Sequence, residues 1–478
     1  MNKLLILLLT LLTAVRSEAK ITLPAFYGDN MVLQQQTQCR LWGKADARKV
    51  ISVITSWDNR HYNCKSDGQG HWQLCIATPK AGGPYTITIS DGAKRMLRNI
   101  LIGELWLCSG QSNMEMPMKG FKGQPVEGAN EDIIGCRDAS LRLFTVKRNA
   151  QLHPVDTVSG QWQEANISSV RPFSATAYYF GKALRQALNV PVGLIVTSWG
   201  GSACEAWMKR EWLKDDWLKA YPQIKNVITQ ENVDRLQQRC PSALYNGMLH
   251  PLIGLSLRGV IWYQGEDNVN RYATYADQLS TLIEGWRKEW GLGDLPFYYC
   301  QIAPYDYSLI HWTANSALLR EQQALVEKKV KNTRMAVLLD AGLQYGIHPR
   351  KKRMAGERLA LLALGNTYRM KGLPDFASFS SVTFRNDTAV VAFDRSKEWI
   401  YFQNGTSSDN FEIAGADSIF HPAKAWIARN RVYLYSESVR KPVSVRYAFH
   451  NWVVGDLMHD GLPVGSFRTD NWNEKTVR

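Results

Sequence analysis

The sequence predicts an α/β protein: a three-layer domain with a mainly parallel sheet, flanked by small antiparallel β regions. Two patterns carry this prediction. In the middle of the 478-residue chain, short apolar runs alternate with stretches in which apolar residues recur every three or four positions, as in amphipathic helices. Strands that alternate with helices form parallel sheets covered on both faces. On either side of this segment, short β-branched and aromatic runs are separated by turn residues, as in antiparallel sheets.

The first 19 residues have the pattern of an export signal. Lys3 precedes an apolar run from Leu4 to Val15, and Ser17 and Ala19 place small residues where a signal peptidase reads them. We therefore expect cleavage after Ala19 and a periplasmic or secreted mature protein. The apolar run is too short to span a bilayer comfortably, and no cysteine follows it closely, so we expect no membrane anchor.

Residues 20–100 are expected to form an N-terminal β-sandwich of accessory type. The strand-like runs are Gln38–Trp42, Val50–Thr55, Trp72–Ile76 and Tyr85–Ser90. Eight cysteines in an exported chain permit disulfides, and Cys64 with Cys75 would close a short loop across a hairpin.

Residues 101–368 are expected to form the α/β domain. Its strand-like runs include Val192–Thr197, Gly259–Tyr263, Phe297–Ile302 and Met335–Leu339, and its amphipathic stretches include Ser174–Leu188, Tyr272–Trp290 and Ala314–Lys328. In a parallel sheet the ligand site lies beyond the carboxyl ends of the strands. Four residues follow or close such strands: Ser112, Gly200, Gln264 and Asp340. We expect them to share one site.

Residues 369–478 are expected to form a C-terminal β-rich region that packs against the N-terminal one. Helical periodicity fades after Gly365. The strand-like runs that follow are Ser381–Phe384, Ala389–Phe393, Ile400–Phe402, Arg431–Tyr435 and Val443–Phe449.

Charge and motifs exclude several classes of function. The formal net charge of +14 suits an anionic glycan or another polyanion as a partner. The basic residues are scattered, and the densest run, Arg350–Arg353, is typical of a solvated helix face. No nucleic-acid-binding motif accompanies it, so we expect no nucleic acid partner. The sequence contains neither Cys-x-x-Cys nor His-Glu-x-x-His, so we expect no metal site.

Ser112 is the candidate nucleophile. A hydrophobic strand ends at Gly110, and Gln111, Ser112 and Asn113 follow it before an acidic segment that tolerates a helix. This placement exposes a hydroxyl beside backbone N–H donors. The alternative is that Ser112 only caps the following helix. The segment is not a Gly-x-Ser-x-Gly elbow, because Met114 stands where the second glycine would be.

Three motifs resemble those of the sialate O-acetylesterase family of SGNH-type hydrolases. They are Gly-Gln-Ser-Asn-Met at 110–114, Trp-Tyr-Gln-Gly-Glu at 262–266 and Ile-His-Pro at 347–349. The likeness extends from Asn30 near the start of the chain to Asp470 near its end. It implies an SGNH-type fold for the central domain and an O-acetylated sialic acid or another acetylated glycan as substrate. No cofactor is implied, because this ester cleavage requires only water.

The resemblance implies the apparatus of acyl transfer. Ser112 would attack the acetyl carbonyl, and His348 would accept the hydroxyl proton and return it to the departing sugar alcohol. The implied oxyanion donors are the backbone N–H of Ser112, those of Gly200 and Gly201, and the side chain of Gln264, which replaces the asparagine of other SGNH-type enzymes. Glycine also lets the backbone approach a substrate closely, although a glycine pair is equally typical of a turn.

The third member of the triad departs from the family pattern. SGNH-type hydrolases commonly place an aspartate two or three residues before the histidine, where this chain has Gly346 and Tyr345. Asp340 is the favoured substitute, because a loop could bring its carboxylate back to His348. Glu266 or a backbone carbonyl are the alternatives.

The predicted substrate contacts are Asn113, Glu266 and Trp207, and packing or support is the alternative role for each. The sequence thus predicts a serine esterase that removes O-acetyl groups from carbohydrate, with O-acetylated sialic acid as the substrate that the resemblance favours. One alternative is an acetylxylan or other polysaccharide deacetylase. Another is a non-catalytic carbohydrate-binding protein on the same scaffold, which the changed residues before His348 favour. A lipid esterase is disfavoured because no apolar lid is evident.

Overall fold

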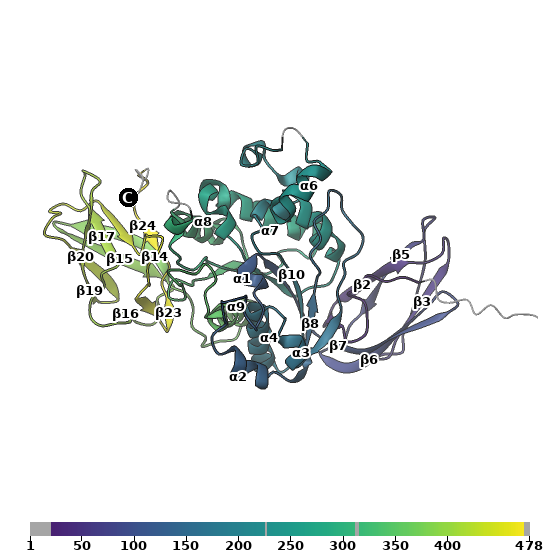
Figure 1. Cartoon of the computed structure of the whole chain (residues 1–478). Coiled ribbons are helices and arrows are strands. Elements are labelled where there is room, and N and C mark those ends of the chain that lie inside the picture. The colour runs from purple at the N-terminus through teal and green to yellow at the C-terminus, as the bar shows by residue number, and fades with distance from the viewer. Residues whose placement is uncertain (1–20, 225–226, 311–314, 473–478) are drawn as a thin grey trace, which may run out of the picture.

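The computed structural model describes residues 21–224, 227–310 and 315–472. The predicted export signal and its cleavage site after Ala19 lie outside these ranges. Figure 1 shows three parts in a row: an N-terminal β region, a central α/β part and a C-terminal β region. No helix within the described ranges is both long and apolar enough to cross a bilayer.

Strand β7 (Lys94–Gly110) belongs to two parts of the fold. Its first half pairs with β6 (Gly82–Ser90) and β1 (Val32–Gln34), and its second half pairs with β10 (Val192–Ser198) and β11 (Gly259–Tyr263). Burial largely alternates at the start of β7 and is continuous from residue 100 onward, because one face of the first half meets water and both faces of the second half are covered. The predicted domain boundary at residue 100 falls inside this strand.

The predicted parallel sheet is confirmed. Its strand order is β13-β12-β11-β7-β10-β8-β9, and each pair along it is parallel except the antiparallel pair β8 and β9. The strands not yet bounded are β8 (Asp138–Thr145), β9 (Trp162–Ala165), β12 (Phe297–Cys300) and β13 (Thr333–Ala336). The pairing of β12 with β13 ends at Cys300 and Ala336, so the predicted strand over 335–339 stops three residues early.

Helices cover both faces of this sheet, as Figure 1 shows. On one side, α4 (Ala175–Leu188) packs against α9 (Lys352–Asn366), and on the other α7 (Tyr275–Trp290) packs against α8 (Ser316–Lys329). The shorter helices are α1 (Ser112–Glu115), α2 (Ala129–Ile134), α3 (Ile167–Val170), α5 (Asp215–Leu218) and α6 (Gln230–Leu236). Fully buried aromatic side chains fill the core, among them Trp106, Trp262 and Trp286.

The N-terminal region contains the four predicted strands: one has the predicted bounds, two are longer at one end, and one is longer at both ends. Strand β2 (Gln38–Lys44) pairs with β5 (His71–Ala77), while β3 (Val50–Thr55) pairs with β4 (His61–Lys65) and with β6. These three pairs are antiparallel, whereas β1 pairs with β7 in parallel. The eight cysteines all lie in the described ranges and are all free, so the structure does not form the Cys64–Cys75 disulfide considered from the sequence.

The C-terminal region consists of small antiparallel sheets. Its strands are β14 (Ser378–Arg385), β15 (Thr388–Asp394), β16 (Ile400–Phe402), β17 (Phe411–Ala414), β18 (Phe420–Pro422), β19 (Lys424–Ala428), β20 (Arg431–Tyr435), β21 (Ser444–Tyr447), β22 (Leu457–His459), β23 (Leu462–Pro463) and β24 (Phe467–Arg468). The expected packing against the N-terminal region is wrong, because the two regions lie on opposite sides of the α/β part (Figure 1). The C-terminal region instead contacts α8, where Arg468 forms an ion pair with Glu321 at 2.8 Å.

Gly110 ends β7 at the point where β7 and β11 come together. Its φ is +139°, and a Cβ at this position would lie 2.1 Å from the carbonyl oxygen of Tyr263. That oxygen also accepts a hydrogen bond of 2.9 Å from the N–H of Gln111. A side chain at residue 110 would therefore separate the two strand ends and displace Ser112.

Substitution Gly110→Ala should destabilise the protein through both backbone strain and this collision. We expect the free energy of unfolding to fall by roughly 3 kcal/mol or more. Gly92→Ala is the matched control, because Gly92 has a φ of +122° with no atom within 4 Å of the added Cβ, and should cost only about 1 kcal/mol. Urea denaturation measures both, and equal losses would contradict the role assigned to Gly110.

Candidate active site

Ser112 lies at the carboxyl end of β7 as the first residue of α1. The N-cap is Gln111, and its side chain makes no capping bond. Ser112 is therefore inside the helix, and the alternative that it is the cap residue is wrong. Its side chain is half-buried. In the described part of the chain, neither its backbone N–H nor its hydroxyl makes a hydrogen bond.

A cavity of about 240 Å³ opens beside Ser112. Its lining brings together four of the predicted site residues, Ser112, Gly201, Glu266 and His348. Arg239 and Asp267 also line it. Within the described ranges, no hydrogen bond joins the Ser112 hydroxyl to the His348 imidazole, although both groups reach the same space.

His348 is held by an amide instead of a carboxylate. Its Nδ1 lies 2.5 Å from Oε1 of Gln124, and its ring meets Phe121 edge-on at a centroid distance of 5.1 Å. Because an amide oxygen only accepts, Nδ1 carries the proton and Nε2 is left with a free lone pair. Burial, with the nearby charge of Lys352, lowers the pKa of His348 to about 4. The imidazole is therefore neutral at neutral pH.

The expectation that Asp340 would orient His348 is wrong. Its two carboxylate oxygens accept hydrogen bonds of 2.6 Å from the two terminal nitrogens of Arg358 on α9. A bidentate pair of this kind fixes both partners. Asp340 thus ties the segment that follows the edge strand β13 to the covering helix α9.

The expectation that the Gln264 side chain would donate to an oxyanion is also wrong. Its Nε2 donates to the carbonyl of Ser202 at 3.1 Å and to Oδ1 of Asn268 at 2.7 Å, and its Oε1 accepts from the Tyr275 hydroxyl at 2.8 Å. The side chain is fully buried. Both amide hydrogens are occupied, so Gln264 supports the strand end from within the core.

The backbone N–H groups of Gly200 and Gly201 differ: in the described residues, the first is hydrogen-bonded and the second is not. The N–H of Gly200 donates to Oε2 of Glu115 at 2.8 Å, which corrects its predicted place in the oxyanion hole. Gly201 has a φ of +71° and lines the cavity. Its N–H donates to no group in the described ranges. The available backbone donors are thus those of Ser112 and Gly201.

A chain of buried polar groups lies next to the cavity. The Asn113 amide donates to Oε1 of Glu266 and, at 3.2 Å, to the carbonyl of Ile347, while its oxygen accepts from the ammonium of Lys352. Burial lowers the pKa of Lys352 to about 7 and raises that of Glu266. Oε2 of Glu266 has no hydrogen-bond partner in the described residues. Asn113 therefore links the cavity carboxylate to the loop that carries His348.

Trp207 is not at the cavity, and its predicted role as a substrate contact is wrong. The side chain is fully buried. Its Nε1 donates to the Ser202 hydroxyl at 2.9 Å, and its ring packs edge-on against Trp262 at a centroid distance of 6.2 Å. Asn113 is likewise buried and supports Glu266 without lining the cavity.

Three functional candidates were not found from the sequence: Gln124, Arg239 and Lys352. Gln124 and Arg239 lie in segments with no motif that marks them. Lys352 belongs to the basic run predicted to be solvated, yet it is 1% exposed. A signal did exist, because Lys352 shares a helix face with the buried Ala355 and Leu359, three and seven residues further on.

Comparison with known proteins identifies the family. The family model described as "Carbohydrate esterase, sialic acid-specific acetylesterase" matches residues 102–345. The sialate O-acetylesterase of Rattus norvegicus is 28% identical over 498 residues, covering 90% of this chain and 89% of the rat protein. The sialate O-acetylesterase of Homo sapiens is 28% identical over 386 residues, covering 73% of this chain and 71% of the human protein.

A solved structure agrees over nearly the whole chain. A carbohydrate acetylesterase from Xanthomonas citri superposes with a TM-score of 0.86 and is 34% identical, covering 95% of this chain and 100% of that protein. Fold and cavity together define an SGNH-type ester hydrolase that removes O-acetyl groups from carbohydrate. The chain belongs to the sialic acid-specific acetylesterase family of carbohydrate esterases, whose model spans more than half of its residues.

Substitution Lys352→Met should change how the free energy of unfolding depends on pH, because it removes a buried ammonium group. The pKa of Lys352 is lowered from 10.5 to about 7 in the folded chain, so between these values the unfolded state binds more protons and folding gains stability as pH rises. Methionine removes this gain. As pH rises from about 7 to about 10, the free energy of unfolding of the wild type should therefore increase relative to that of Lys352→Met. Denaturant titration at each pH measures both. Lys351→Met is the control, because Lys351 is exposed. If the stability difference between wild type and Lys352→Met did not vary with pH, the buried charge would be contradicted.

Proposed function

We propose that this protein is a serine esterase that hydrolyses acetyl esters of carbohydrate hydroxyls, with O-acetylated sialic acid as the preferred substrate. The observation that carries the proposal is the single cavity shared by Ser112, His348 and Gly201. It offers a hydroxyl, a neutral imidazole and unoccupied backbone N–H groups within one small space. These are the three components that acyl transfer from an ester requires.

In the proposed mechanism, the Ser112 oxygen attacks the acetyl carbonyl while Nε2 of His348 takes the hydroxyl proton. The N–H groups of Ser112 and Gly201 donate to the oxyanion that develops. Each such donor is worth about 3 kcal/mol of transition-state stabilisation. The protonated imidazole then gives its proton to the departing sugar oxygen. Water, deprotonated by the same imidazole, releases acetate and restores Ser112.

Gln124 is the proposed positioning residue for His348. Its amide oxygen at 2.5 Å selects the tautomer with a free Nε2, which is the orienting part of the role that a carboxylate plays in a conventional triad. A neutral amide stabilises an imidazolium less than a carboxylate does. Glu266 is the proposed contact for a substrate hydroxyl, because its Oε2 is buried at the cavity without a partner in the described residues.

Two observations support a sialic acid as the sugar. The relatives from rat and man are sialate O-acetylesterases. Arg239 lines the cavity and binds Oδ1 of Asp267 through Nε at 2.8 Å, while its terminal nitrogens make no hydrogen bond in the described residues. A guanidinium with free terminal N–H groups suits the carboxylate of a sugar acid.

Another acetylated polysaccharide is the second candidate substrate. The Xanthomonas citri structure is described only as a carbohydrate acetylesterase, and it has the higher sequence identity of the relatives given above. The catalytic groups would be the same for either substrate. The pattern at residues 1–19 supports export, so we place the proposed activity in the periplasm or outside the cell.

Acetate release from O-acetylated sialic acid and from acetylated xylan, measured side by side, tests both parts of the proposal. The wild type should release acetate faster from the sialic acid, and Ser112→Ala should lower kcat on both substrates by about a thousandfold or more. Ser159→Ala is the control, because this exposed loop serine lies outside the cavity lining. Equal release by wild type and Ser112→Ala would contradict the serine mechanism.

Substitution Arg239→Gln should affect KM for one of the two candidate substrates and not for the other. Loss of the guanidinium should raise KM for the sialic acid by about tenfold and leave KM for acetylated xylan unchanged. An equal effect on both substrates would remove the support for a sugar acid without affecting the esterase mechanism.

The pH profile tests His348 as the base. A base must be unprotonated, and the pKa of His348 is lowered from 6.5 to about 4, so kcat/KM should stay level into mild acid and fall only near pH 4. Circular dichroism over the same range checks that the protein remains folded. A fall centred near the ordinary histidine value of 6.5 would argue against this environment for the catalytic imidazole.

A further inference from the structure

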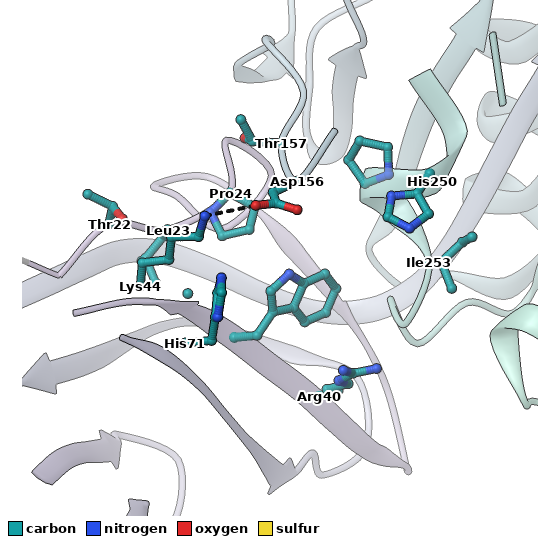
Figure 2. Close-up of a pocket in the computed structure, with 13 residues that line it drawn as sticks. Thr22, Leu23, Pro24, Arg40, Lys44, His71, Asp156, Thr157, His250 and Ile253 are labelled. Carbon is teal, nitrogen blue, oxygen red and sulfur yellow. Dashed lines mark hydrogen bonds and ion pairs between the residues drawn. The ribbon is translucent and has the colours of Figure 1, made fainter. Parts of the chain in front are cut away.

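A second and larger cavity lies where the N-terminal β region meets the α/β part. Its volume is about 440 Å³, within the roughly 300–1,000 Å³ range of small-molecule sites. Figure 2 shows Arg40, Lys44 and His71 on one side of it and His250 and Ile253 on the other. It shares no lining residue with the catalytic cavity, so the proposed mechanism uses none of its groups.

One wall of this cavity is the outer face of β2. Residues alternate along a strand, so Arg40, Trp42 and Lys44 share a face, and His71 of β5 lies directly opposite Lys44. The half-buried indole of Trp42 is held edge-on against the buried rings of Phe26 and Tyr27, at centroid distances of 5.4 and 5.0 Å. Trp42 is thus a rigid aromatic surface in a solvent-accessible cavity.

Polar groups surround this aromatic surface, and most of them are basic. Nζ of Lys44 and Oδ2 of Asp156 form a 2.8 Å ion pair across the cavity, drawn in Figure 2. The guanidinium of Arg40 lies 5.3 Å from the centroid of the Trp42 ring. Among the lining residues, the two cations of Arg40 and Lys44 outnumber the single carboxylate of Asp156. The cavity therefore favours an anionic ligand.

His250 has one ring nitrogen, Nε2, that makes no hydrogen bond to any residue the structure describes. Its Nδ1 lies 3.1 Å from the carbonyl oxygen of Val155, and because a carbonyl only accepts, Nδ1 carries the proton and Nε2 is an acceptor. Val155 immediately precedes Asp156, so the same loop that supplies the carboxylate also orients the imidazole. Donors, acceptors and an aromatic face are thus fixed around one space.

We propose that this cavity is a second saccharide-binding site, separate from the catalytic cavity, and that it binds an acidic sugar residue of a glycan. The apolar face of a pyranose ring would pack on Trp42, its hydroxyls would bond to Asp156 and His250, and its carboxylate would face Arg40 and Lys44. The site binds without hydrolysing, since neither a serine nor a cysteine is among its lining residues. It anchors the enzyme to glycans that carry several acidic sugars.

Calorimetric titration with 3′-sialyllactose, which has no O-acetyl group, tests the site independently of hydrolysis. Lactose is the neutral comparison. The wild type should bind 3′-sialyllactose at least tenfold more tightly than lactose, and Trp42→Ala and Arg40→Gln should each weaken that binding by tenfold or more. Arg40 is exposed, so Arg40→Gln keeps the test valid if Trp42→Ala fails to fold. Both variants should hydrolyse 4-nitrophenyl acetate at the wild-type rate, because the catalytic cavity is unchanged.

Trp399→Ala is the matched control, because this indole is 72% exposed and lies outside the cavity. It should bind 3′-sialyllactose like the wild type. Binding unaffected by both Trp42→Ala and Arg40→Gln would overturn the site, and equal affinity for lactose would overturn its acidic ligand. If Arg239→Gln alone abolished binding, the sugar would occupy the catalytic cavity only, which also overturns the second site. A chain that binds here but lacks Ser112-dependent hydrolysis would refute the esterase proposal alone.

Discussion

The backbone hydrogen bonds of β7 are the constraint on which the rest of the molecule depends. This one strand pairs with β1 and β6 in the N-terminal region and with β10 and β11 in the central sheet. Buried N–H and C=O groups must be paired, so these neighbours cannot shift independently. Near the middle of β7, the buried carboxylate of Glu104 binds Arg258 at 2.5 Å and the hydroxyl of Tyr368 at 2.8 Å. The end of β7, beside the catalytic cavity, is thereby held in place by strands of both parts.

At the end of that strand, several polar side chains are buried and bonded to one another. Asn113 uses both ends of its amide to join Glu266, Lys352 and the carbonyl of Ile347. An unpaired polar group at this depth would be costly, whereas a connected set makes a rigid support. The orientation of His348 is thus determined by buried contacts on one side of its loop and by the exposed Gln124 on the other. In the proposed mechanism, the Gln124 amide takes only the orienting part of the role that a carboxylate plays in a conventional triad.

Local pattern was enough to predict the alternation of strands and helices in the central part and the placement of Ser112, because periodicity and a terminal glycine are properties of neighbouring residues. It missed strands such as β4, β8 and β9. It could not predict the partners of Asp340 or Gln264, since each depends on a side chain from another element, Arg358 in one case and Ser202 with Asn268 in the other. Trp207 was misjudged for a related reason. A large ring after a strand is equally consistent with a binding surface and with a core, and only the packing around it decides.

One cysteine makes the N-terminal region suitable for selective labelling with a fluorophore. Seven of the eight cysteines are buried or half-buried, and Cys75 is the exposed one. Cys75 lies directly opposite Arg40 in the pairing of β2 with β5, so its thiol shares the sheet face that carries Trp42. A maleimide fluorophore would therefore react first at this thiol, next to the wall of the larger cavity. The native sequence already carries a reporter for events at the junction of its first two parts.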